Sequence, residues 1–121
     1  MKQEVKAELI EALRSGEYPQ GKGGLKYADG RHCVHGVLCE VYAKHHPAAS
    51  WVPHLWSNGF LSDYLAFSSP EADTTGDDTT SPPRAVREWA EMDYDEMNAL
   101  MKANDKGRSF LQIADLLEAQ S

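Results

Sequence analysis

The chain is short of positive charge and of long apolar runs, and each shortage excludes a class of protein. Twelve Lys and Arg residues stand against nineteen Asp and Glu residues, which gives a formal net charge of -7. Duplex DNA is bound through many basic contacts to phosphates, so we expect no duplex DNA partner. No stretch approaches the roughly 20 apolar residues that span a bilayer, and the N-terminus is not a signal peptide. We therefore expect no membrane partner and a cytoplasmic location.

Cysteine is scarce as well, since the chain holds only Cys33 and Cys39. The residues between them follow a helical pattern, which would place the two thiols on nearly opposite sides, too far apart for a disulfide. Free thiols fit the reducing cytosol. Hydrophobic residues make up 41% of the 121 residues, enough to bury one core. The sequence predicts a single domain over residues 1–121.

Apolar residues recur at helical spacing near the N-terminus, after Cys33 and in the last third of the chain. The segment that follows Cys33 is the most apolar, and we expect it to form the central helix. Pro82 and Pro83 open a short helix, and two capping-box patterns precede the last two helices. They pair Asp93 with Glu96 and Ser109 with Gln112. These segments predict four or five helices.

The strand signals are weaker. Asp29 and Gly30 form a turn pair between "GLKY" and "RHCV", which predicts a short antiparallel hairpin. Residues 50–67 contain an Asn-Gly turn and suggest short strands or a packed loop. Residues 68–81 are polar and acidic, and we expect a mobile loop there. The sequence therefore predicts an α+β fold, mostly helical, around a small antiparallel hairpin or sheet.

A candidate anion site begins at "QGKGG", residues 20–24, which we call the glycine-rich segment. Its backbone amides can approach a ligand closely, and Lys22 and Arg31 would supply positive charge across the predicted hairpin. The spacing is not that of a P-loop or a dinucleotide fingerprint. The alternative is that the glycines only turn the chain.

Aromatic residues suggest a stacking wall for a purine or pyrimidine. Trp51, Trp56, Tyr64 and His54 lie close together in the sequence, and a base stacked on an aromatic ring gains about 1–3 kcal/mol. The alternative is that the tryptophans fill the core, because a small domain has few other large side chains.

The histidines and cysteines allow two further hypotheses. Helical spacing places His35, Cys39 and His46 in one sector, as a metal site would need, and His32 and His35 flank Cys33 at a helix start, where a thiol pKa is lowered. No zinc-motif spacing is present, and an inert buried cysteine is the simpler interpretation. We expect no metal ligands, no cofactor and no catalytic residue.

Four motifs occur in a familiar order: "ALRSGEYPQGKGGL", "CVHGVLCEVY", "PPRAVREWAEM" and "ALMKANDKGRSFLQIADLLE". Together they resemble a family of short proteins encoded by bacteriophages and prophages, over most of the chain outside about 47–80. In that family the second motif often has two adjacent cysteines and a leucine before Gly-Val-Leu-Cys. Here His32 and His35 stand at two of those places.

The resemblance implies a setting, because small phage accessory proteins often counter host defences. We expect an anti-defence binding protein that sequesters a small nucleotide-like anion without turnover, in a pocket that a homodimer would complete. The alternatives are an enzyme that cleaves or modifies such a signal and an inhibitor that docks on a host defence protein. The expected ligand-binding residues are Gln20, Lys22, Gly23, Arg31, His32, His35, Trp51, His54 and Trp56.

Overall fold

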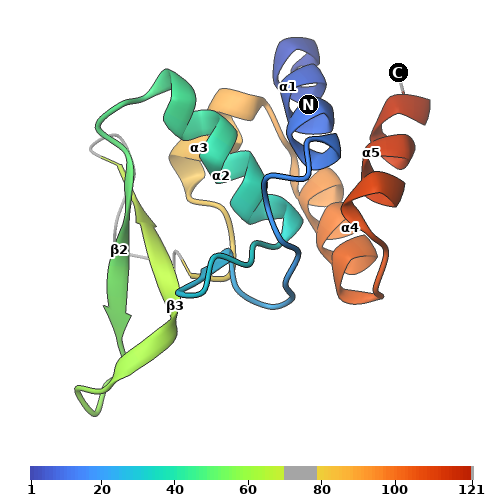
Figure 1. The fold of residues 1–121 in the computed structure, drawn as a ribbon. Coiled ribbons are helices and arrows are strands. Elements are labelled where there is room, and N and C mark those ends of the chain that lie inside the picture. Colours follow the sequence, from blue (N-terminus) through green and yellow to red (C-terminus); the bar gives the residue numbers. More distant parts are fainter. Residues whose placement is uncertain (70–78, 121) are drawn as a thin grey trace.

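The computed structural model describes residues 1–69 and 79–120. In this part of the chain five helices and three strands form a small α+β fold (Figure 1). In chain order the elements are α1 (Gln3–Arg14), β1 (Lys26–Tyr27), α2 (Val34–His45), β2 (Ser50–Leu55), β3 (Leu61–Ser68), α3 (Arg84–Ala90), α4 (Tyr94–Asp105) and α5 (Phe110–Ala119). The predicted fold class is confirmed. Most of the loop expected at 68–81 falls at 70–78, outside the described residues.

Both capping boxes are confirmed. The Asp93 carboxylate accepts the backbone N–H of Glu96 at 2.8 Å, and the Glu96 carboxylate accepts that of Asp93 at 3.3 Å. Ser109 and Gln112 form the same reciprocal pair at the start of α5. Each box satisfies two N–H groups that a helix start leaves without an intrahelical partner. Among the described helices, none has the length and apolar character to cross a membrane.

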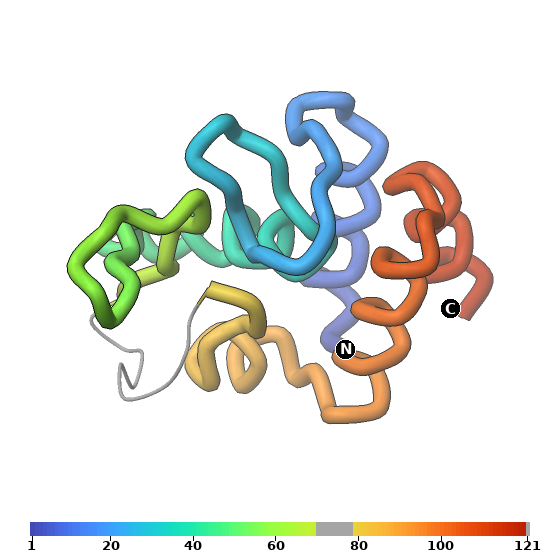
Figure 2. The backbone as a smooth tube through the Cα atoms, turned by 90° about the horizontal axis from the view of Figure 1, so that it is seen from below, coloured from blue at the N-terminus to red at the C-terminus, as the bar shows by residue number. Residues whose placement is uncertain are grey.

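The strands form one antiparallel sheet in the order β1-β3-β2. A turn at Asn58 and Gly59 joins β2 to β3, and Gly59 adopts the positive φ of 86° that favours glycine. The short strands suggested within 50–67 are therefore confirmed. The β2–β3 hairpin stands to one side of α2, whereas α1, α4 and α5 gather on the other side (Figures 1 and 2).

The hairpin predicted around Asp29 and Gly30 is only partly correct. The turn is present, because the Tyr27 N–H donates to the Arg31 carbonyl at 2.8 Å. The principal partner of β1 is nevertheless β3, where Tyr27 lies opposite Tyr64. Two-residue strands gain little by pairing with each other, and β1 is stabilised by joining the longer hairpin at its edge.

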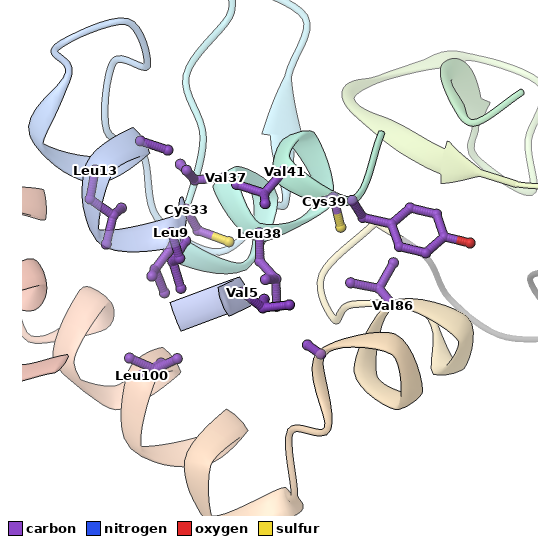
Figure 3. Packing of buried hydrophobic residues seen from close by; sticks show 14 of the residues in the cluster. Val5, Leu9, Leu13, Cys33, Val37, Leu38, Cys39, Val41, Val86 and Leu100 are labelled. Atoms are coloured by element: carbon purple, nitrogen blue, oxygen red, sulfur yellow. The ribbon is translucent and has the colours of Figure 1, made fainter. Parts of the chain in front are cut away.

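Helix α2 lies at the centre of the core, as expected. Val37 and Leu38 of α2 are fully buried and pack with Leu9 of α1 and Val86 of α3 (Figure 3). Phe67 of β3 is also buried, so the sheet is joined to the helical core through this strand. Burial of side chains of this size stabilises the fold by about 1.5–3 kcal/mol each.

Gly36 sets the distance between α2 and the glycine-rich segment. A Cβ atom at this position would overlap the backbone carbonyl of Leu25. That carbonyl also accepts the Cys33 N–H at 3.2 Å, just before α2 begins. The absence of a side chain therefore allows the backbone before β1 to lie directly on the first turn of α2.

The substitution Gly36→Ala tests this contact, because helix propensity and the overlap with Leu25 change the free energy of unfolding in opposite directions. Ala is favoured over Gly in a helix by about 1 kcal/mol, but the overlap with Leu25 should lower the free energy of unfolding by about 3 kcal/mol. Chemical denaturation measures the difference. Ala7→Gly, at an exposed position of α1, is the control for helix propensity and should lower stability by about 1 kcal/mol. A Gly36→Ala variant as stable as the wild type would contradict the contact.

Candidate functional site

Gln20 and Asn104 fasten the glycine-rich segment to the C-terminal helices. The Gln20 amide donates to the Asn104 Oδ1 at 3.1 Å and to the Arg108 carbonyl at 2.7 Å, and it accepts the Phe110 N–H at 3.0 Å. Asn104, which is 1% exposed, donates in turn to the Gly21 carbonyl at 2.9 Å. Gln20 was predicted to bind ligand, and the structure instead engages its amide within the fold.

A continuous row of rings lies on the outer face of the sheet, and we call it the aromatic row: Tyr27, Tyr64, Trp56 and His54. The ring centroids of Tyr27 and Tyr64 are 4.8 Å apart, those of Tyr64 and Trp56 6.4 Å, and those of Trp56 and His54 5.7 Å. The Arg31 guanidinium lies 4.2 Å from the Tyr27 ring centroid and ends the row. The structure thus brings together three predicted site residues, Arg31, His54 and Trp56.

The glycine-rich segment packs against the tyrosines of the row. A Cβ on Gly24 would overlap the Tyr64 ring, and Gly23, with φ 86°, lies beside both tyrosine hydroxyls. The Tyr27 hydroxyl donates to the Lys22 carbonyl. Burial, reinforced by the neighbouring Tyr64 hydroxyl, raises the pKa of Tyr27, so its ring stays neutral at pH 7. Here the glycines allow close approach to aromatic rings, which sequence reasoning did not anticipate.

Positive charge lies at the Tyr27 end of the row, where Arg31 is placed. Arg31 forms an ion pair with Asp29 at 2.9 Å, and both side chains are about half exposed. The backbone N–H of Arg31 and its guanidinium lower the pKa of the Asp29 carboxyl. The Lys22 ammonium lies at the α4–α5 turn, 3.8 Å from the point where a side chain on Gly107 would begin. The Lys22 ammonium thus lies beside the α4–α5 turn and the Arg31 guanidinium beside Tyr27.

A second group of polar residues lies between the sheet and α2. His32 contacts the Glu40 carboxylate through Nε2 and the Gly30 carbonyl through Nδ1, both at 2.8 Å. The Trp51 indole donates to Glu40 at 3.0 Å, and the Lys26 ammonium lies 3.6 Å from it. Burial acts to raise the pKa of Glu40, but these hydrogen bonds and charges lower it to about 2. His32 and Trp51 therefore hold Glu40 in place inside the molecule.

The two tryptophans predicted to share a wall lie on opposite faces of the sheet. Trp51 is opposite Phe67 in the register and packs on it with ring centroids 4.9 Å apart, toward the core. A register shift follows between Pro53 and Leu55, and Trp56 then joins Tyr64 on the outer face. Strand alternation and this irregularity separate them.

His35 is buried between α2 and α4 rather than exposed to a ligand. Its side chain is 1% exposed, and burial lowers its pKa to about 4, while the Met97 backbone carbonyl acts in the opposite direction. The Nε2 atom has no hydrogen-bond partner in the described part of the chain. His35 lines a small cavity of about 80 Å³ together with Cys33, Asn104 and Asp105.

The residues behind the thiol and metal hypotheses are buried or packed against other side chains. Cys33 stands at the N-cap of α2, as expected, but burial raises the pKa of its thiol. Cys39 is completely buried, and the His46 ring stacks on Tyr42 with centroids 3.8 Å apart. Over residues 1–69 and 79–120, no three His, Cys, Asp or Glu side chains are placed to hold a metal ion.

Sequence reasoning missed three residues that organise these sites: Tyr27, Glu40 and Asn104. Glu40 could have been recognised from the sequence, because it is a charged residue inside the mostly apolar α2 segment. The role of Asn104 was not recognised, because "NDKGR" was interpreted only as a connection between helices. Tyr27 could be placed beside Tyr64 only through the register of β1 with β3.

The fold and the sites define a small α+β protein with an aromatic surface on its sheet and with both cysteines and two histidines, His32 and His35, buried. The chain belongs to the family described as a domain of unknown function, DUF8296, whose model matches residues 1–121. No curated protein and no solved structure matches the chain.

The depressed pKa of His35 predicts an acid-dependent loss of stability. The unfolded chain binds a proton at this residue near pH 6.5, but the folded protein does so only near pH 4, so acid favours unfolding. At roughly 1.4 kcal/mol per pKa unit, His35 should lower the free energy of unfolding by about 3 kcal/mol between pH 6.5 and 4.

Denaturant titrations across that range measure the slope. His35→Leu should flatten it, and His54→Gln, a control at a half-buried position of β2, should retain it. An unchanged slope in His35→Leu would show that another group titrates.

Proposed function

We propose that the protein is a non-enzymatic binding protein that holds a small nucleotide-like anion on the aromatic row. The observation that carries the proposal is the continuous run of ring contacts from Tyr27 through Tyr64 and Trp56 to His54, with Arg31 at one end. Trp56 is 49% exposed and therefore offers a ring face to a ligand. A base stacked on one ring of this row would gain about 1–3 kcal/mol.

Arg31 supports the anionic part of the ligand. Its guanidinium stacks on Tyr27 and pairs with Asp29, both at the exposed turn after β1. Exposed ion pairs of this kind contribute only about 0–1 kcal/mol, so a phosphate can replace Asp29 at little cost. A planar guanidinium also matches two phosphate oxygens at once.

The arrangement of the reactive groups supports binding without turnover. His32 contacts Gly30 and Glu40, and the Cys33 thiol is buried with a raised pKa. Neither group belongs to the aromatic row. A nucleophile and a base within hydrogen-bond reach of the same reacting atom would be needed for the alternative enzyme.

The resemblance to bacteriophage proteins supports an anti-defence setting, in which the ligand would be a nucleotide immune signal. A protein partner is the second candidate, because the hairpin end exposes large apolar side chains. Phe60 is 71% exposed, Leu61 70% and Leu55 57%. These exposed side chains could pack against a second copy of the chain, and the homodimer would then enclose the aromatic row. They could equally dock on a host defence protein.

Fluorescence titration with adenosine 5′-monophosphate and adenosine tests the proposal. The wild type should show saturable quenching, and Trp56→Ala or Tyr64→Ala should weaken binding by at least tenfold, as expected for a lost stacking contact. Phe60→Ala, an exposed aromatic outside the row, is the matched control and should bind normally. Arg31→Gln should reduce affinity for the nucleotide to that for the nucleoside.

Mass spectrometry of the same mixtures separates binding from turnover. The proposal expects intact nucleotide to be released on heating. A new product would favour the enzyme instead, and equal binding by the wild type and Trp56→Ala would exclude the aromatic row as the site.

A further inference from the structure

A separate hollow of about 510 Å³ lies where α3 turns into α4. We call it the corner hollow. Its volume falls within the roughly 300–1,000 Å³ of small-molecule sites. It is lined by Arg84, Arg87, Glu88, Glu91, Met92, Asp93 and Tyr94.

Arg87 is the unusual residue of the corner hollow. Its Nε atom is buried and has no hydrogen-bond partner, and the structure gives its guanidinium no ion pair with any described residue. The guanidinium lies 5.3 Å from the centroid of the Tyr94 ring, which is 66% exposed. Buried donors are nearly always satisfied. A carboxylate in the hollow would accept from the terminal nitrogens of this guanidinium.

The backbone at Glu91 shapes one wall of the corner hollow. Glu91 caps α3 in the left-handed conformation with φ 53° and is the one non-glycine residue with positive φ in the described chain. A left-handed residue is a common way for a helix to end, and glycine usually occupies that position. The turn lets the Met92 N–H reach the Arg87 carbonyl at 3.0 Å, which starts α4 directly beside Arg87.

The charges of the corner hollow select the kind of ligand. Arg84 and Glu88 pair at 2.7 Å and largely cancel. The remaining charged lining is Arg87 with two carboxylates, Glu91 and Asp93, and is therefore net negative. A phosphate dianion would meet repulsion there, whereas a ligand with one carboxylate and one ammonium group would match both signs.

We propose that the corner hollow binds a small zwitterion of the amino-acid type. Arg87 takes its carboxylate, Glu91 and Asp93 face its ammonium group, and the Tyr94 ring covers its aliphatic part. The site shares no residue with the aromatic row and does not depend on the proposed nucleotide function.

Amide NMR titration with three probes tests the charge requirement. L-alanine carries both groups, acetate only the carboxylate and methylammonium only the cation. L-alanine should cause saturable shifts at residues 87–94, and each half-probe should bind at least tenfold more weakly. No saturable shift, or an equal response to acetate, would overturn the proposal.

Two substitutions separate recognition from structure. Arg87→Gln should weaken L-alanine binding at least tenfold, and Arg108→Gln, the same change at the exposed α4–α5 turn, should leave it unchanged. Glu91→Gly relieves the left-handed strain, so it should raise the thermal unfolding midpoint and weaken binding at the same time. Unchanged affinity in both Arg87→Gln and Glu91→Gly would overturn the assignment even if the hollow binds the probe.

Discussion

The side-chain amide of Asn104 is the interaction on which the rest of the structure depends. Its oxygen accepts from the Val34 N–H at 3.2 Å and from Gln20, while its nitrogen donates to the Gly21 carbonyl. One buried amide thereby joins the end of α4, the start of α2 and the glycine-rich segment. A buried polar group left without its partner costs about 1–3 kcal/mol, and losing Asn104 would leave several partners unpaired.

These hydrogen bonds of the Asn104 amide explain why the aromatic row can form. The glycine-rich segment is held between α2 and the sheet. Gly36 allows α2 to lie against the Leu25 backbone, and Gly24 allows the segment to lie against the Tyr64 ring. The segment then leads into β1, which adds Tyr27 to the edge of β3. Gln20, one of the residues expected to bind a ligand, takes part in the same hydrogen-bond network.

Local patterns in the sequence were enough to predict the helices. Apolar periodicity located α2, and the pairing of Asp93 with Glu96 located the start of α4, because both signals act within a few residues. The sheet depends on contacts between distant segments, so the pairing of β1 with β3 had no local signal. Trp51 and Trp56 are five positions apart, so strand alternation places them on opposite faces as soon as the segment is assigned to a strand rather than to a packed loop.

The central claim is that Asn104 places Tyr27 beside Tyr64, and ring-to-ring nuclear Overhauser effects test it most directly. The wild type should show cross-peaks for Tyr27 with Tyr64 and for Trp51 with Phe67. In folded Asn104→Ala the first set should weaken while the second, within the β2–β3 hairpin, persists. The exposed control Asn98→Ala should keep both. Undiminished Tyr27–Tyr64 cross-peaks in folded Asn104→Ala would contradict the account.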